Sequence, residues 1–431
     1  MLQRTSRDGK IVVPRNTYSF VGATIVSNKY ERGRGLILFD REITSIGSSA
    51  FYRCSGLTTI QIPDSVTSIE YGAFGNCTGL TSIQLPGSVT SIGQEAFWNC
   101  TGLTSIQIPK SVTRIDGFLF DGCDGLYSII VDPENTVYDS RDNCNAIIET
   151  KSNTLVCGCK NTIIPDSVTS IRGMAFYACG LTSIQIPKTV ISIGERAFGE
   201  CIKLTSITVD SSNPVYDSRN NCNAIIETKS NTLVAGCKNT IIPDSVTSIG
   251  NSAFSYCTGL TNIKIPNTVK SIGSRAFDNC TSLTSVYIPD SVTSIGSSAF
   301  ISCTGLTSVH IPNSLTFIAD NTFCYCTGLT SIEIPSSVVS IWSQAFSGCR
   351  GLTSIDLPDS ITSIGSSAFS GCTGLTSITV RSATPFSLYE EVFGYTNDCP
   401  IYVPAESVDN YRTNPYWSSY SSRIQAIPSG T

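Results

Sequence analysis

The sequence contains very little histidine and little charge. His310 is the only histidine among 431 residues, which excludes catalytic triads and metal sites that depend on several histidines. Charged residues make up 14% of the chain, against about 25% in an average protein, and the net charge is −5. A nucleic-acid-binding protein needs a stripe of basic side chains, and this composition does not favour one.

Motifs for membrane insertion and catalysis are also missing. The sequence has no run of about 18 apolar residues and therefore predicts no membrane-spanning helix. It has no phosphate-binding loop, no G-x-S-x-G motif and no pair of carboxylates at a catalytic spacing. We therefore expect neither an enzyme nor a bound cofactor.

The N-terminal residues do not resemble a secretory signal. Basic side chains precede residues 11–13, but this apolar stretch is too short and ends at Pro14. Three explanations stay open: a leader that the chain as given lacks, another export route, or a protein that remains in the cell or in a particle.

The dominant feature is an internal repeat of 23 residues. Each copy follows the pattern C-x-x-L-x-x-I-x-[IL]-P-x-x-[VIL]-x-x-I-x-x-x-A-F-x-x, as in residues 77–97. Its cysteine recurs at Cys54, Cys77, Cys100 and Cys123, and again at Cys257, Cys280, Cys303, Cys326, Cys349 and Cys372. A unit this short cannot bury a core alone, so neighbouring units must stack into a solenoid.

Each repeat predicts two short extended segments. In residues 80–85, Ile83 and Leu85 alternate with polar side chains, which indicates a strand with one buried face. Pro86 lacks an N–H group and ends that strand, and residues 89–92 form the second segment. A full helix does not fit into the remainder. The coil is therefore β-rich, with 3₁₀ or single-turn segments at most on its convex side.

This pattern resembles the BspA-like (Treponema pallidum-type) leucine-rich repeats over residues 43–380. Its aromatic column comprises Phe51, Phe74, Phe97, Phe120, Phe176, Phe198, Phe254, Phe277, Phe300, Phe323, Phe346 and Phe369. The resemblance implies a curved right-handed solenoid with a parallel sheet on its concave face. It also implies surface proteins of gut and oral bacteria, including Bacteroides relatives, in which such arrays act as adhesins or binding scaffolds.

Other segments interrupt or flank the repeat. Nearly the same sequence occurs near residues 132–160 and 210–238, and each copy predicts a β-hairpin inserted into the solenoid. Terminal units of a solenoid must cover its open core. We therefore assign residues 1–42 to an N-terminal cap and residues 381–431 to a C-terminal cap.

The nineteen cysteines raise the questions of metal binding and of disulfides. Cys157 and Cys159 are close in sequence, but no histidine lies near them, so we expect no metal site. The cysteines of the coils are expected to be free and buried, because a residue at one recurring inward position already has a packing role.

The hairpins offer a separate disulfide hypothesis. Counting outward from the loop at 150–153, Cys144 faces Cys159, and Cys222 faces Cys237 in the second copy. Facing cysteines in both copies favour a cross-strand disulfide in an oxidising compartment. Duplication of one segment explains the same pattern equally well.

The first hairpin also contains oxygen ligands suited to calcium. These are Asp139, Asp142, Asn143 and Glu149, but the second copy has Asn220 in place of Asp142, and no calcium-loop motif is present. We favour a turn in which Asp and Asn side chains bond to their own backbone.

One outward position varies along the array, at the x of I-x-[IL]-P. It reads Gln61, Gln84, Gln107 and Gln185 in the first half, and then Lys264, Tyr287, His310, Glu333 and Asp356 on consecutive units. At about 4.8 Å per rung, the second set forms a stripe on the order of 20 Å long. Neutral drift at exposed positions is one explanation. The other is a recognition surface centred on Tyr287 and His310, whose rings supply stacking area.

Three function classes remain. The favoured one is a recognition or adhesion scaffold that binds a protein or glycan, such as a host matrix or surface component, at the cell surface or after secretion. The alternative is a structural or assembly component, such as a spacer or a part of a phage or secretion particle. An unrecognised hydrolase is the weakest reading.

Overall fold

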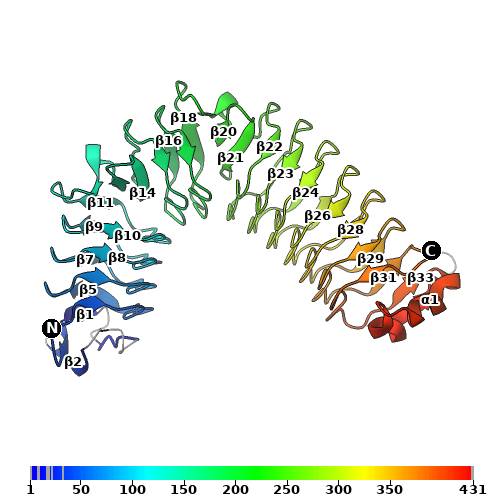
Figure 1. Cartoon of the computed structure of the whole chain (residues 1–431), viewed down its shortest axis with the longest axis horizontal. Helices are drawn as coiled ribbons and strands as arrows, with labels where there is room; N and C mark the ends of the chain where they lie inside the picture. The colour runs from blue at the N-terminus through cyan, green and yellow to red at the C-terminus, as the bar shows by residue number, and fades with distance from the viewer. Residues whose placement is uncertain (1, 7–9, 16–19, 21–22, 32–33, 429–431) are drawn as a thin grey trace. The chain divides into compact units, whose positions relative to one another are not determined.

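The computed structural model of the chain describes residues 2–6, 10–15, 20, 23–31 and 34–428. It contains two compact units, Met1–Val215 and Tyr216–Thr431, and each is a stack of β-rich coils with its own hydrophobic core (Figure 1). Typical coils contribute one longer strand to a long-strand ladder and one two-residue strand to a short-strand ladder, and both ladders are parallel. The predicted β-solenoid is therefore confirmed within each unit.

Unit 1 begins with an antiparallel edge. Strand β1 (Leu2–Ser6) pairs with β5 of the first coil and with β3 (Arg34–Phe39), which pairs with β2 (Ile25–Glu31). The long-strand ladder comprises β5 (Leu57–Gln61), β7 (Ser82–Gln84), β9 (Ser105–Ile108) and β11 (Ser128–Val131), and later β16 (Ser183–Ile186) and β18 (Ser206–Val209). The short-strand ladder comprises β4 (Ser45–Ile46), β6 (Ser68–Ile69), β8 (Ser91–Ile92) and β10 (Arg114–Ile115).

The two duplicated segments form antiparallel strand pairs inside the sheets. The first comprises β12 (Tyr138–Asp139), the 3₁₀ helix η2 (Arg141–Asn143), β13 (Ala146–Glu149) and β14 (Thr154–Gly158). Strand β14 also pairs in parallel with β15 (Ser170–Ile171), which continues to β17 (Ser192–Ile193). The second strand of the pair is thus a rung of the ladder, and the segment does not leave the solenoid as an insertion would.

Unit 2 repeats this arrangement. It begins with β19 (Tyr216–Asp217), η3 (Arg219–Asn221), β20 (Ala224–Glu227) and β21 (Thr232–Gly236). The short-strand ladder continues through β22 (Ser248–Ile249), β23 (Ser271–Ile272) and β25 (Ser294–Ile295), and then β27 (Phe317–Ile318), β28 (Ser340–Ile341), β30 (Ser363–Ile364) and β32 (Ser387–Leu388). The long-strand ladder comprises β24 (Ser285–Tyr287) and β26 (Ser308–His310), and then β29 (Ser354–Leu357), β31 (Ser377–Val380), β33 (Ile401–Val403) and β34 (Ile424–Ala426).

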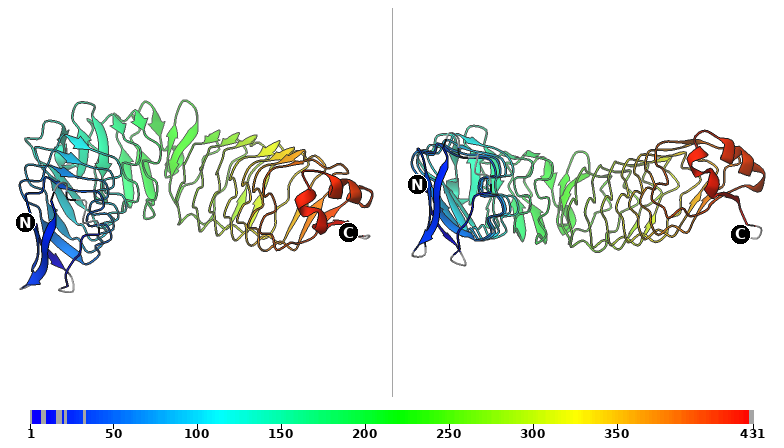
Figure 2. Two further views of the ribbon diagram at one scale, coloured as in Figure 1. Left: turned by 60° about the horizontal axis from the view of Figure 1, so that its bottom comes forward. Right: turned by 90° about the horizontal axis from the view of Figure 1, so that it is seen from below.

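Short helices cover the last coils of unit 2 (Figure 2). They are η4 (Ala405–Ser407), α1 (Val408–Thr413) and η5 (Ser418–Arg423). Trp417 between them is fully buried, and its ring lies edge-on to those of Phe386 and Tyr411. This aromatic cluster shields the end of the core from water.

Columns of identical side chains build the core. Phe300 is fully buried, and its ring stacks on those of Phe277 and Phe323 in the neighbouring coils, with centroids 5.0 and 5.5 Å apart. The thiol of Cys303 donates a hydrogen bond to the carbonyl of Phe277, at 3.1 Å, and the same bond recurs along the cysteine column. The cysteine therefore satisfies a turn carbonyl of the preceding coil, which accounts for its recurrence.

The long-strand ladder of unit 2 is less continuous than the repeat predicts. The segments that contain Lys264 and Glu333 have no strand in the structure, although they align with β24 and β26 in the repeat. The proline that follows each segment already removes one ladder donor. A three-residue strand has few bonds left, so the loss of another ends its regular pairing.

Candidate functional site

Parallel pairing places the predicted recognition residues side by side. In β24 and β26, Val286 and Val309 point into the core, while Tyr287 and His310 are directly paired and point outward. Tyr287 is 61% exposed. Lys264, Glu333 and Asp356 are also exposed on their own coils. Strand alternation therefore turns Tyr287, His310 and Asp356 outward, and Lys264 and Glu333 are exposed at the equivalent positions of coils without a long strand.

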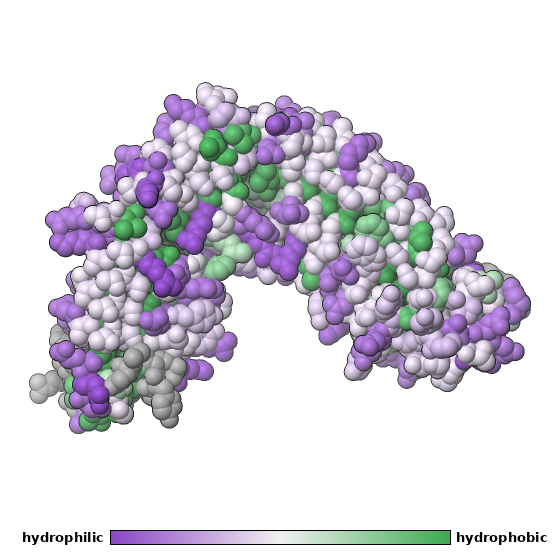
Figure 3. Space-filling model, in the orientation of Figure 1, coloured by the Kyte–Doolittle hydropathy of each residue, from purple (hydrophilic) through white to green (hydrophobic). Residues whose placement is uncertain are grey.

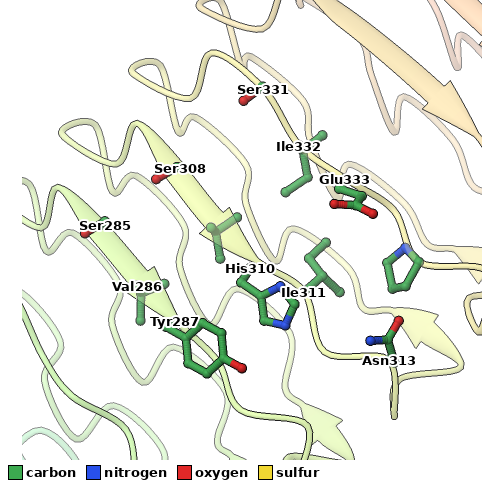
Figure 4. A pocket seen from close by; sticks show the side chains of 12 residues that line it. Ser285, Val286, Tyr287, Ser308, His310, Ile311, Asn313, Ser331, Ile332 and Glu333 are labelled. Carbon is green, nitrogen blue, oxygen red and sulfur yellow. The ribbon is translucent and has the colours of Figure 1, made fainter.

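The rings of Tyr287 and His310 form a stacked pair. Their centroids are 4.7 Å apart and their planes differ by 5°. Both rings line a hollow of about 460 Å³, which Glu333 and Asn313 also line (Figure 4). The stripe is therefore a concave surface with an aromatic wall and a carboxylate on the next coil.

The two carboxylates at the acidic end of the stripe differ in their surroundings. Asp356 forms an ion pair with Arg381, in which the guanidinium Nη2 lies 2.6 Å from Oδ2 and Nε also donates to the carboxylate. Arg381 follows strand β31 at the position where most coils have proline. Since this arginine neutralises Asp356, Glu333 is the carboxylate of the stripe that lies beside the rings.

The first half of the chain has glutamine, threonine and exposed isoleucine at the same positions, with Ile130 paired to Gln107 and Thr208 paired to Gln185. Gln61 pairs with Gln84 across β5 and β7, and Gln107 and Gln185 are exposed in the same column. Figure 3 shows that residues of intermediate hydropathy dominate the visible face of the coils, with strongly hydrophilic and hydrophobic residues scattered among them. The stacked aromatic pair therefore distinguishes the stripe from the glutamine and isoleucine positions of the first half.

The predicted facing of the hairpin cysteines is wrong. A β-bulge between Ile147 and Ile148 shifts the register by one residue, so Ala146 pairs with Gly158, and Cys144 is no longer opposite Cys159. The second copy has the same bulge, which separates Cys222 from Cys237. All nineteen cysteines are free thiols in the structure. Burial raises the pKa of the Cys144 thiol to about 11, so this thiol is protonated at neutral pH.

Asp139 and Glu149 of the hairpin segment are engaged in side-chain interactions. Asp139 forms an ion pair with Arg141 at 2.5 Å and accepts a hydrogen bond from the Thr150 hydroxyl at 2.9 Å. Burial opposes ionisation of Asp139, but the hydrogen bonds from Arg141 outweigh it and hold the pKa below its usual value. Glu149 accepts a hydrogen bond from Ser152. Within the described residues, no group of three or more His, Cys, Asp or Glu side chains is arranged to hold a metal ion.

Comparison with known protein families identifies the repeat of this chain. The family model described as a BspA type leucine rich repeat region matches residues 36–147, 146–234, 226–341 and 316–425, which is most of the chain. The chain belongs to this family. The predicted resemblance is therefore confirmed. In the described part of this BspA-type protein, no helix is long and apolar enough to cross a membrane.

Solved structures of similar proteins come from several bacteria. A leucine rich cell surface protein from Faecalibacterium prausnitzii is 30% identical, with 83% of this chain and 86% of that chain covered and a TM-score of 0.47. A leucine-rich repeat protein from Bacteroides ovatus is 26% identical, with coverage of 93% and 90% and a TM-score of 0.42. The T. pallidum leucine rich repeat protein is 25% identical, with coverage of 55% and 86% and a TM-score of 0.30. No curated protein matches the chain.

Proposed function

We propose that this BspA-type protein is a non-enzymatic recognition or adhesion scaffold at the cell surface, and that it binds a protein or glycan through the stripe of unit 2. The observation that carries this proposal is the stacked pair of Tyr287 and His310 beside a hollow on the long-strand ladder. The similarity to a leucine rich cell surface protein of F. prausnitzii supports the location.

The stripe suits a ligand that has both a flat apolar face and polar groups. The exposed face of Tyr287 provides stacking area for a sugar ring or a peptide side chain. Lys264 and Glu333 lie on opposite sides of the ring pair along the column, and charged groups at two ends fix the orientation of a bound ligand. The neutralised pair of Asp356 and Arg381 lies beyond Glu333 and contributes hydrogen-bonding groups without net charge.

A glycan and matrix-protein array with the folded chain tests this proposal, followed by affinity measurements on each ligand found. The double variant Tyr287→Ser/His310→Ser should bind at least about tenfold more weakly, which corresponds to ~1.4 kcal/mol. Its thermal unfolding should not change, because both side chains point outward. The matched control is Gln61→Ser/Gln84→Ser, which alters the same column in unit 1.

Undiminished binding by the double variant would contradict the assignment of the stripe. If the array yields no protein or glycan ligand at all, the recognition function itself fails. The alternative is then favoured, in which the protein is a spacer or another component of a larger assembly.

A further inference from the structure

A second hollow, of about 630 Å³, lies on the short-strand ladder of unit 2. Its floor consists of β22, β23 and β25, which present Ser248, Ser271 and Ser294 in register. The Oγ atoms of Ser248 and Ser271 are 2.8 Å apart and share a hydrogen bond. A glycine follows two residues after each serine, at Gly250, Gly273 and Gly296. We call this surface, together with the two rings at its end, the serine trough.

Two aromatic rings line the trough where the repeat changes. Phe317 occupies the position of the serine in its coil, and Trp342 occupies the position of the glycine in the next coil. Their rings stack with centroids 4.5 Å apart and planes 7° apart. Trp342 is 41% exposed, and its indole N–H donates to the Ser340 hydroxyl at 3.2 Å. The pair is therefore a rigid aromatic platform that remains open to solvent.

The short-strand ladder loses its regular pairing where the sequence of the repeat changes. At Gly296 a Cβ atom would lie 2.5 Å from the backbone nitrogen of Ser274, so adjacent coils approach this closely only where the residue is glycine. The equivalent residue of the next coil is Ala319, which also lines the trough. Strands β25 and β27 belong to different sheets, and the hydrogen bond from Gly296 N to Ile272 O has no counterpart from Ala319 N to Ile295 O in this described region. The short-strand pairing is thus interrupted where the hollow meets the rings, although the hydrogen bond from Ser298 N to Asp320 O still joins the same two coils.

The chemistry of the lining is uncharged and rich in hydroxyl groups. Serine hydroxyls, the Asn251 amide and the two rings line the trough, and none of its lining residues is Asp, Glu, Lys, Arg or His. A sulfated or uronic-acid glycan would therefore find no countercharge here. An extended peptide would gain little, because the trough is a sheet face, where strand backbone groups are already paired, and not an open edge. A neutral sugar has an apolar ring face for the platform and hydroxyl groups for the serine row.

We propose that the serine trough binds an uncharged oligosaccharide, with one sugar ring stacked on Phe317 and Trp342 and the following sugars along the row of serine hydroxyls. The rungs repeat at about 4.8 Å, which is close to the length of one sugar unit in an extended chain. The serine trough lies on the short-strand ladder, whereas the stripe of Tyr287 and His310 lies on the long-strand ladder. The two sites can therefore be tested separately.

Titration of the full chain with neutral hexasaccharides tests this proposal, with cellohexaose, laminarihexaose, xylohexaose and mannohexaose as the probes. In a Trp98→Phe background, Trp342 and the fully buried Trp417 are the remaining tryptophans, so a change in fluorescence on binding reports the platform. We expect at least one probe to bind. Its affinity should not change between about pH 5 and pH 9, since no titrating side chain lines the trough.

The variant Phe317→Ser/Trp342→Gly restores the serine and glycine of the preceding coils, and calorimetric titration, which does not need the Trp342 signal, should show binding of that probe weakened at least about tenfold. A second variant, Ser294→Lys, places a long charged side chain on an exposed position of the floor and should have the same effect without touching the core. Trp98→Ser is the matched control, because Trp98 stacks on Tyr52 in unit 1, with centroids 6.4 Å apart.

The proposal is overturned by binding of none of the four hexasaccharides, by wild-type affinity in both trough variants, or by a clear preference for heparin or a peptide over the neutral probes. Tyr287→Ser/His310→Ser should bind the hexasaccharide as the wild type does. Loss of hexasaccharide binding in that variant would assign the sugar to the stripe and would also overturn the trough as its site.

Discussion

Removal of one ring from the phenylalanine column gives a direct measure of how the coils hold together. Phe300→Ala deletes a fully buried ring between two stacked neighbours, at 5.0 and 5.5 Å, and leaves a cavity in the middle of unit 2. Truncation of a buried phenylalanine costs ~3–5 kcal/mol. Each stacked aromatic pair contributes about 0.5–1.5 kcal/mol beyond the area that it buries, and two pairs are lost here, so we expect the upper part of that range.

Guanidinium unfolding of the Trp98→Phe protein measures this cost, because Trp342 and Trp417 both report on unit 2. The midpoint should fall while the slope of the transition stays constant, since the surface exposed on unfolding is nearly unchanged. Ser308→Ala, at an exposed position of the same coil, is the control and should change stability by less than about 0.5 kcal/mol. A loss below about 1 kcal/mol for Phe300→Ala would refute the view that ring stacking stabilises adjacent coils.

Two further predictions concern the titrating groups of the core. Alkylation of the unfolded, unreduced chain should label all nineteen cysteines, and an intact mass with fewer than nineteen labels would show a disulfide. The native chain should react slowly at neutral pH, because burial raises the pKa of thiols such as Cys257 to about 12. Burial, with Glu95 and Glu200 nearby, raises the pKa of Asp121 to about 8. The unfolded carboxyl has a pKa of about 3.9, so the folded state binds the extra proton between these values, and the stability of unit 1 should fall as the pH rises from about 4 to about 8. Asp121→Asn should reduce this fall in urea unfolding at the two pH values, and an identical pH dependence in the variant would contradict the assignment.

The coil architecture could be predicted from the sequence because every buried position repeats its contacts at the same spacing. The outward direction of Tyr287 and His310 followed from strand alternation in the same way. The register of the hairpin cysteines could not be counted, since a single bulge between Ile147 and Ile148 depends on packing rather than on loop length. Arg381 was missed because it lies beyond the strand, although an arginine at a proline position was a visible signal.

The Phe317–Trp342 pair was missed for a related reason. These residues occupy different positions of two adjacent coils, so no single column of the repeat contains both. The signal was instead the loss of the two smallest residues of the pattern, serine and glycine, in consecutive copies. Only the structure shows that the two departures meet in one stacked platform.

The two sites of unit 2 differ in what their side chains cost the fold. Tyr287 and His310 replace outward side chains on a strand pair that remains intact, so their presence demands no adjustment of the backbone. Phe317 and Ala319 stand where the preceding coils of unit 2 have serine and glycine, and the ladder is interrupted between β25 and β27. In a solenoid each coil is stabilised mainly by its neighbours, so lost pairing between two coils weakens the array at that point. An aromatic platform at this interruption is better explained by ligand binding than by packing, because a ring that stays 41% exposed, as that of Trp342 does, adds little to the core.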